Sequence, residues 1–308
     1  MEGMIQVSYE NGPTVEDDPG LTLLQIALKH GVPHVHDCGG HARCSTCRVM
    51  VRAGLENVLP RNEPEQRLAA FKGLEPDVRL ACQTRVRGPV RVRRLVHDDK
   101  DAAIAEAESG GSSGCERPLA ILFSDVRDFT PLSEANLPYD VVHMLNRYFL
   151  TMGDAVLQND GYIDKYIGDG MMALFGVSGG DPRSVCLAAV RAGLRMLDNL
   201  AELNPYLRDH FGVEFRMRIG IHFGDVVLGQ MGHPKKMQFT AIGDSVNMAS
   251  RIEAAVKGTT ANLLVSEAVH GHIRDDVQTG IEVDAVLKGK HGTYRLYEVV
   301  RIQRRQTD

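Results

Sequence analysis

Residues 119–130 read Leu-Ala-Ile-Leu-Phe-Ser-Asp-Val-Arg-Asp-Phe-Thr, and this stretch decides the fold of the C-terminal part of the chain. Its apolar first half suits a strand that is covered on both faces. The strand runs directly into Asp125. A carboxylate at the end of a buried strand is costly unless a partner neutralises it, so the sequence predicts such a partner beside Asp125.

A second carboxylate occupies a similar setting further along the chain. Asp169 lies between two glycines and precedes the apolar run 171–175, so a tight hairpin turn is favoured here. If the hairpin lies beside the first strand, Asp125 and Asp169 converge. Two convergent carboxylates are oxygen ligands that Mg²⁺ or Mn²⁺ prefers, with substrate phosphates completing the shell. The alternative is a pair of unrelated turn or capping aspartates.

Length and composition limit the number of domains and the class of protein. The 308 residues suffice for two domains that each bury a core. Hydrophobic residues make up 43% and charged residues 24%, as in ordinary globular proteins. No run approaches about 18 apolar residues and the first residues lack signal-peptide features, so we expect no transmembrane segment and a cytoplasmic location. The net charge of −5 indicates no nucleic-acid-binding surface.

Four of the six cysteines gather in the N-terminal third, at Cys38, Cys44, Cys47 and Cys82. In a cytoplasmic chain, clustered thiols indicate metal binding rather than disulfides. Three thiolates on one loop with a distant fourth can enclose a 2Fe-2S cluster. A zinc site is the competing interpretation, but zinc sites usually pair two Cys-x-x-Cys units and only one is present.

The cysteine spacing C-x5-C-x2-C, with Arg79-Leu-Ala-Cys-Gln83 at the fourth cysteine, resembles the 2Fe-2S ferredoxin family. The five-residue gap resembles the adrenodoxin-like branch. The resemblance implies a β-grasp domain over residues 1–98 whose four cysteines hold a 2Fe-2S cluster. It also implies a redox partner, an electron donor or reductase.

Residues 99–117 are expected to form a charged and Gly/Ser-rich connector. The tract 109–114 is Ser-Gly-Gly-Ser-Ser-Gly, a composition that is flexible and has no preferred length. Such a tract cannot carry torque as a rigid helix would. Any signal from the N-terminal domain must therefore pass through docking or through ordering of this segment.

A third stretch, Phe239 to Glu253, contains Gly243-Asp-Ser-Val-Asn247 and Arg251. Together with residues 119–130 and Gly168-Asp169, and in the same order, it resembles the class III nucleotide cyclases, the adenylate and guanylate cyclases. The resemblance implies an α+β catalytic domain over residues 118–308 with a βαββαβ, ferredoxin-like core. It also implies a homodimer, since one chain carries every residue of a site that two subunits share.

The resemblance further implies the roles of five site residues. Asp125, Asp169 and the backbone carbonyl of Val126 would hold two Mg²⁺ or Mn²⁺ ions. Asn247 would orient the ribose, and Arg251 would stabilise the transition state. The i, i+4 spacing of Asn247 and Arg251 puts both side chains on one helical face.

Base recognition is implied for Lys165 and Thr240, a combination that accompanies ATP use in the family. A lysine donor suits adenine N1, an acceptor, whereas guanine presents a protonated N1. Threonine in place of the commoner aspartate resembles the bicarbonate-responsive subgroup, so bicarbonate is a candidate activator. Lys235 and Lys288 match the regions of triphosphate-binding lysines, with solvated loop lysines as the alternative.

Periodicity and turn residues predict several element boundaries in the C-terminal part. A long helix is expected over 181–203, and a strand from 215 is expected to turn at Gly224-Asp225. Closing strands are expected over 283–290 and 294–300.

The sequence thus predicts an adenylate cyclase that forms 3′,5′-cyclic AMP and pyrophosphate from ATP by two-metal catalysis at a homodimer interface. The redox state of the fused 2Fe-2S cluster is expected to regulate it. Two alternatives stay open. One is a guanylate cyclase, and the other is an electron-transfer ferredoxin whose C-terminal domain only binds nucleotide and dimerises.

Overall fold

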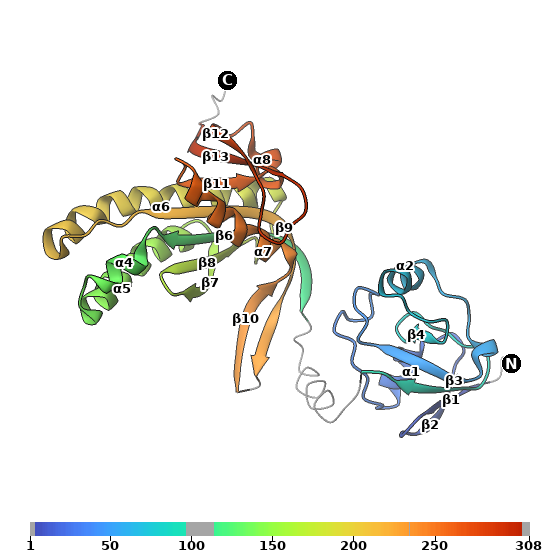
Figure 1. Cartoon of the computed structure of the whole chain (residues 1–308). Helices are drawn as coiled ribbons and strands as arrows, with labels where there is room; N and C mark the ends of the chain where they lie inside the picture. The colour runs from blue at the N-terminus through green and yellow to red at the C-terminus, as the bar shows by residue number, and fades with distance from the viewer. Residues whose placement is uncertain (1–3, 97–113, 234, 304–308) are drawn as a thin grey trace. The chain divides into compact units, whose positions relative to one another are not determined.

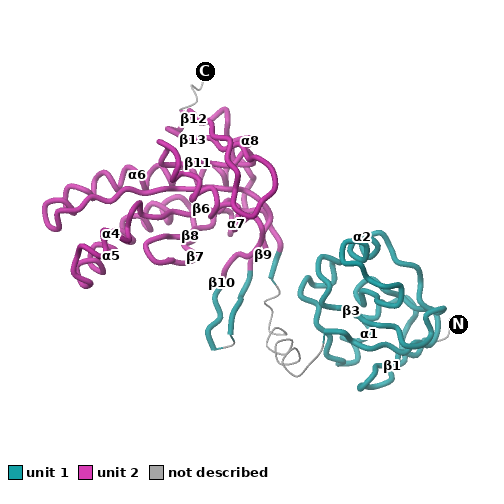
Figure 2. Tube along the Cα trace, in the orientation of Figure 1, with its two compact units in different colours: residues 1–115, 229–238 teal, residues 116–228, 239–308 magenta. Residues whose placement is uncertain are grey.

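The computed structural model describes residues 4–96, 114–233 and 235–303 (Figure 1). The chain divides into unit 1, Met1–Cys115 with Gly229–Gln238, and unit 2, Glu116–Leu228 with Phe239–Asp308 (Figure 2). Most of the predicted connector, residues 99–113, lies outside the described residues. The domain bounds therefore stay a prediction. Within the described ranges, no helix is long and apolar enough to cross a membrane.

Unit 1 is built on a mixed five-stranded sheet with the strand order β2-β1-β5-β3-β4. Its strands are β1 (Ile5–Tyr9), β2 (Thr14–Asp17), β3 (Arg48–Ala53), β4 (Val78–Leu80) and β5 (Val90–Arg94). β1 pairs in parallel with β5 and antiparallel with β2. The helices are α1 (Leu23–Lys29) and α2 (Glu63–Lys72), with the 3₁₀ turn η1 (Leu55–Asn57) between them in sequence. A helix packed on such a sheet is the predicted β-grasp arrangement.

Side-chain caps fix both helices of unit 1. Thr22 and Gln25 form a reciprocal capping box at the start of α1. Asn62 caps α2, because its side chain accepts a hydrogen bond from Glu65 N at 3.1 Å. α2 ends at Gly73 in the left-handed region, where glycine is favoured. Asn62 thereby ties the start of α2 to a defined position in unit 1.

Unit 2 is built on an eight-stranded sheet with the order β12-β13-β11-β9-β6-β8-β7, and β10 pairs with β9 (Figure 1). The strands are β6 (Cys115–Val126), β7 (Gly161–Ile167), β8 (Gly170–Phe175), β9 (Met217–His233), β10 (Lys236–Ile242), β11 (Leu263–Ser266), β12 (Val277–Ala285) and β13 (Tyr294–Ile302). The helices are α4 (Phe129–Glu134), α5 (Pro138–Leu157), α6 (Pro182–Phe211), α7 (Asp244–Ala255) and α8 (Glu267–Ile273), with the 3₁₀ turn η2 (Val256–Gly258). The order β9-β6-β8-β7, with helices between β6 and β7 and between β8 and β9, confirms the predicted βαββαβ core.

The central strand β6 is covered on both faces, as its apolar sequence predicts. Ala120 and Leu122 belong to the core cluster that includes α5 and α6. Leu119 and Ile121 point to the other face, into a cluster that includes Ala249 of α7. Two helical layers therefore enclose the strand that leads to Asp125.

The helix predicted to end at residue 203 continues to Phe211, with Pro205 inside it. A proline in a helix interior costs about 3 kcal/mol. The buried Leu207 carries the apolar stripe beyond the proline. Asn204 also exchanges hydrogen bonds with the Phe215 backbone, at 2.9 and 3.0 Å, and so holds the helix end against the start of β9. We infer that these tertiary contacts offset the cost of the proline.

Two further boundaries were predicted wrongly. β9 runs without a break through Gly224-Asp225. A Cβ atom at Gly224 would lie 2.5 Å from Ser245 Oγ, so this glycine allows close approach of α7 rather than a turn. β12 ends at Ala285 instead of extending to residue 290, and Gly289 in the following loop has a φ of 72°. Lys288 therefore lies in a loop.

β9 and β10 pair with each other as a hairpin (Figure 1). Gly229, in β9, lies against Gly114, the residue before β6. A Cβ atom at Gly229 would lie 2.7 Å from Gly114 Cα, so the close approach of the two backbones requires glycine there.

Candidate active site

The fold brings Asp125 and Asp169 together. Asp125 lies near the end of β6, and Asp169 lies in the turn between β7 and β8. β6 pairs antiparallel with β8, with Ser124 opposite Met171, which places the turn beside the end of β6. Val126 N donates a hydrogen bond to Asp169 Oδ2 at 3.1 Å. The predicted convergence of the two carboxylates is thus present in the structure.

The electrostatics of this pair fit a divalent cation. Burial and, after it, the neighbouring Asp125 carboxylate together raise the pKa of Asp169 to about 6. Among the described residues, no three His, Cys, Asp or Glu side chains form a group that could hold one metal ion. Two carboxylates with remaining positions for substrate phosphates and water match the way proteins bind Mg²⁺.

Arg218 is a site residue that the sequence analysis missed. It lies on β9 and forms an ion pair with Asp125, 93 residues away in sequence. Its Nε also lies 2.8 Å from Glu253 Oε1 on α7. The signal in the sequence is an arginine within the buried strand run 217–221, where a charge needs a partner. The guanidinium is the neutralising partner that the sequence predicts beside Asp125.

Lys165 and Thr240 are in direct contact although 75 residues separate them. Lys165 Nζ donates a hydrogen bond to Thr240 Oγ1 at 3.0 Å. Asp164, which the sequence analysis also missed, joins them. Thr240 Oγ1 donates to Asp164 Oδ2 at 2.9 Å, and Lys165 Nζ lies 3.1 Å from the same oxygen.

Asn247 and Arg251 lie one turn apart on α7, as predicted. Asn247 is exposed and Arg251 is half-buried. Between described residues, no hydrogen bond or ion pair joins either side chain to Asp125 or Asp169. A single chain therefore does not bring all the predicted site residues into contact.

The two lysines predicted for the triphosphate lie in separate loops. Lys288 is exposed in the loop between β12 and β13. A Cβ atom at the next residue, Gly289, would lie 3.5 Å from Arg251 Nη2, so this loop adjoins α7. The nearby Lys290 forms an ion pair with Asp244. Lys235 lies in the turn of the β9–β10 hairpin, in unit 1.

The four predicted cluster cysteines come together as two pairs. The Cys44 thiol donates to Cys38, which lowers the pKa of Cys38 to about 4, and the Cys47 thiol donates to Cys82, which lowers the pKa of Cys82 to about 7. Three backbone N–H groups, those of residues 41, 43 and 44, also donate to Cys38. Two thiol pairs surrounded by N–H donors fit a 2Fe-2S cluster, since each iron needs two thiolates and the sulfurs accept hydrogen bonds.

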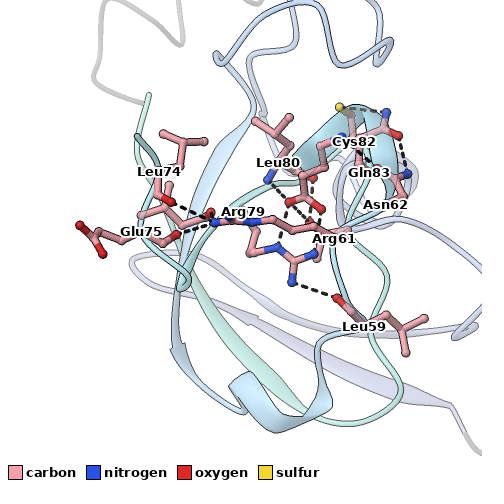
Figure 3. Close-up of polar contacts among 12 residues, drawn as sticks. Leu59, Arg61, Asn62, Leu74, Glu75, Arg79, Leu80, Cys82 and Gln83 are labelled. Atoms are coloured by element: carbon pink, nitrogen blue, oxygen red, sulfur yellow. Dashed lines mark hydrogen bonds and ion pairs between the residues drawn. The ribbon is translucent and has the colours of Figure 1, made fainter. Parts of the chain in front are cut away.

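The loop around Cys82 is fastened to α2 (Figure 3). Gln83 Nε2 donates to Gly40 O at 2.8 Å. The same nitrogen lies 3.5 Å from Cys82 Sγ. Gln83 Oε1 accepts from Asn62 Nδ2, the cap of α2, at 2.9 Å. Residue Glu65 of α2 is fully buried and accepts hydrogen bonds from the Arg79 guanidinium at 2.8 Å. The ligand loop and α2 therefore form one connected polar network.

Family models match both parts of the chain. A model described as the adenylate and guanylate cyclase catalytic domain matches residues 115–299. A model described as a 2Fe-2S iron-sulfur cluster binding domain matches residues 8–87.

The chain is similar to curated cyclases over its C-terminal part. It is 34% identical to adenylate cyclase 1 of Rhizobium meliloti over 201 residues, which cover 65% of this chain and 30% of that protein. It is 36% identical to an adenylate cyclase of Anabaena cylindrica over 203 residues, 64% of this chain and 39% of that one. The chain thus spans well under half the length of these relatives.

Solved structures of both cyclase types resemble unit 2. The guanylyl cyclase Cya2 is 31% identical with a TM-score of 0.58, and the match covers 63% of this chain and 97% of that one. The adenylyl cyclase CyaB from P. aeruginosa is also 31% identical with a TM-score of 0.58, over 62% and 97%. Overall similarity therefore does not distinguish ATP from GTP. With the cyclase model matching more than half of its length, the chain belongs to the adenylate and guanylate cyclase catalytic domain family.

Proposed function

We propose that the chain is an adenylate cyclase, which converts ATP to 3′,5′-cyclic AMP and pyrophosphate. The observation that carries this proposal is the contact between Lys165, on β7, and Thr240, on β10. The Lys165 ammonium is a donor that suits the unprotonated N1 of adenine. The protonated N1 of guanine would face the Lys165 ammonium, donor against donor. Enzymes reject substrates strongly when such polar groups are left unpaired.

In the proposed reaction the ribose 3′-oxygen forms a bond to the α-phosphorus, and the bond from the α-phosphorus to pyrophosphate breaks. Two Mg²⁺ or Mn²⁺ ions, when bound, supply activation of the 3′-hydroxyl and neutralisation of the triphosphate. Asp125, Asp169 and the Val126 carbonyl would hold them. Asn247 would orient the ribose, and Arg251 would stabilise charge that grows on the α-phosphoryl oxygens.

Two lysines are candidates for the triphosphate. Arg218 is already ion-paired with Asp125 and Glu253, so it would hold the Asp125 carboxylate in place rather than bind phosphate. Lys288 lies in the loop beside Arg251, and Lys235 is a further candidate on the β9–β10 hairpin. Pyrophosphate, the leaving group, carries the most charge in the reaction, so these two lysines would hold it.

A homodimer completes the proposed site. The chain carries both the carboxylates and the Asn247/Arg251 pair, yet no hydrogen bond or ion pair of the described residues joins them within one chain. A two-fold axis would place α7 of one copy opposite the carboxylates of the other and generate two equivalent sites.

The test is the product formed from Mn²⁺-ATP and from Mn²⁺-GTP by the full chain. We expect cyclic AMP, lost by at least about 100-fold in Asp125→Ala and unchanged in Asp154→Ala, an exposed carboxylate on α5. A preference for GTP would identify a guanylate cyclase instead. Stoichiometric nucleotide binding without turnover would favour an electron-transfer protein with a non-catalytic dimerisation domain.

We also propose that a 2Fe-2S cluster on Cys38, Cys44, Cys47 and Cys82 regulates the cyclase through its redox state, with an electron donor or reductase as partner. Activity should be measured as a function of poised potential, with the visible absorption of the cluster recorded in parallel. Equal activity in oxidised, reduced and cluster-free protein would leave the N-terminal domain without a sensing role. Addition of bicarbonate in the same assay tests the activator that Thr240 suggests.

A further inference from the structure

We propose that Asp164 is a specificity-determining residue that fixes the Thr240 hydroxyl as a hydrogen-bond acceptor for the 6-amino group of adenine. The proposal rests on the proposed adenylate cyclase function and deepens it. Asp164 lies outside the predicted site. Its proposed role is to make Thr240 select adenine over other bases.

A β-bulge brings Asp164 to the site. In the pairing of β7 with β8, Ile163 lies opposite Ala173 and Lys165 lies opposite Met172, so Asp164 is the extra residue. Neighbouring residues on a regular strand point to opposite faces. A bulge re-aims one of them, and here both Asp164 and Lys165 reach Thr240 on β10.

The hydrogen bonds then fix the direction of the hydroxyl. A threonine hydroxyl has one donor and two acceptor positions, whereas an ionised carboxylate only accepts. Thr240 Oγ1 donates to Asp164 Oδ2 at 2.9 Å and accepts from Lys165 Nζ at 3.0 Å. The exposed fractions of Asp164 and Thr240 are only 7% and 6%, so water does not compete freely for these bonds. The open position on the hydroxyl oxygen is therefore an acceptor.

An acceptor beside a lysine donor matches adenine and not a 6-oxopurine. Adenine offers an amino donor at C6 and an acceptor at N1. A 6-oxopurine offers an acceptor at C6 and a donor at N1, so both contacts would be mismatched. A threonine without Asp164 could rotate its hydroxyl and donate to a 6-oxo group. With Asp164 the threonine keeps the acceptor role that aspartate has in the commoner family pattern.

The decisive measurement is the ratio of kcat/KM for ATP to that for inosine triphosphate, in the full chain with Mn²⁺. Inosine triphosphate carries the 6-oxo group and N1–H of guanine but lacks its 2-amino group. It therefore tests recognition of the C6 and N1 positions alone. We expect Asp164→Asn to lower the ratio about tenfold, because an asparagine amide can donate to Thr240 and free its hydroxyl hydrogen. The matched control Asp154→Asn, on the exposed face of α5, should leave the ratio unchanged. An unchanged ratio in Asp164→Asn would overturn the proposal.

Two substitutions at Thr240 keep the proposal testable if Asp164→Asn does not fold. Thr240→Ser retains the hydroxyl and should retain the ratio. Thr240→Val removes the acceptor and should lower the ratio about tenfold. A ratio in Thr240→Val equal to that of the wild type would refute the role of the hydroxyl, and with it the role of Asp164.

Failure of the inference can be distinguished from failure of the proposed function by direct binding. Calorimetry with the α,β-methylene analogues of ATP and inosine triphosphate requires no turnover. If the wild type forms no cyclic AMP, the proposed function fails. The ratio of the two dissociation constants still tests Asp164, with the same expected tenfold change in Asp164→Asn and the same refutation by an unchanged ratio.

Discussion

At the scale of single residues, Asp169 opposes the stability of the metal-free chain. Its pKa is raised to about 6 by burial and by the Asp125 carboxylate, so the folded chain holds a proton that the unfolded chain releases near pH 4. The stabilisation from this proton is fully present below that pH and is lost as the pH rises through about 6. Above pH 6 the charged Asp169 therefore lowers the free energy of unfolding.

We expect Asp169→Asn to raise the free energy of unfolding of the metal-free chain at pH 7.5 by roughly 1 kcal/mol, discounted because the group is largely solvated. Urea denaturation at pH 4 and pH 7.5 measures the difference. With Mn²⁺ present the order should reverse, since only the wild type gains stability from the metal. A variant less stable than the wild type in chelator at pH 7.5 would contradict this account.

The same titration predicts how metal binding depends on pH. Because a divalent ion requires the carboxylate form of Asp169, Mn²⁺ affinity should weaken as the pH falls through about 6. At pH 6, where about half of the Asp169 carboxyl groups are protonated, binding should release about half a proton, and the release should approach one proton at lower pH. Calorimetry in buffers of different ionisation enthalpy measures this release. A pH-independent affinity between pH 5 and 8 would argue that Asp169 is not a ligand.

Gln83 is one of the residues whose side chains approach a cluster cysteine. Its Nε2 lies 3.5 Å from Cys82 Sγ, and N–H donors to cluster sulfurs favour the reduced, more negative state. We expect Gln83→Leu to make the reduction potential more negative, as followed by potentiometric titration of the visible absorption. Gln66→Leu, at an exposed position on α2, should leave the potential unchanged and serves as the control.

At the scale of elements, the buried Glu65–Arg79 pair holds α2 to the Cys82 loop. Glu65 also accepts from Leu80 N at 2.8 Å. Removing one partner of a buried pair costs about 3–5 kcal/mol, because the other charge stays buried. We expect Glu65→Gln to cost this much in urea denaturation of unit 1 and to speed loss of the cluster absorption.

The control for this substitution lies on the same helix. Glu63 pairs with Arg67 at the surface, where the two side chains are 74% and 77% exposed. Glu63→Gln should therefore change the free energy of unfolding by less than about 0.5 kcal/mol. Equal effects of the two substitutions on the free energy of unfolding would show that burial of the Glu65–Arg79 pair does not determine its contribution to stability.

Sequence patterns predicted the elements whose signals are local. The apolar run before Asp125 and the glycines around Asp169 gave a strand, a hairpin and the convergence of two carboxylates. Asp164 and Arg218 escaped prediction because their partners depend on strand register and on pairing across the sheet. The bulge that re-aims Asp164 appears only when β7 is aligned with β8. Likewise, the helix predicted over 181–203 continues to Phe211, because the contacts that hold its last turns are tertiary.

At the scale of the whole molecule, the proposed homodimer makes a quantitative prediction. Asp125→Ala and Arg251→Ala should each be inactive, but their equal mixture should regain activity after subunit exchange. Half of the random dimers would be mixed, and each would hold one intact site, so about a quarter of wild-type activity is expected. Measuring cyclic AMP in mixtures of varied ratio checks the prediction. A monomeric site would give no recovery at any ratio.

The contact between Gly114 and Gly229 couples the start of β6 to the β9–β10 hairpin. The backbone at the start of β6 lies directly against the base of the hairpin whose tip bears Lys235. Because the Gly/Ser-rich connector before β6 cannot carry torque, a signal from earlier residues could reach this strand pair only through docking or ordering. A displacement at this backbone contact would shift the base of the hairpin and, with it, Lys235, which we propose for the triphosphate.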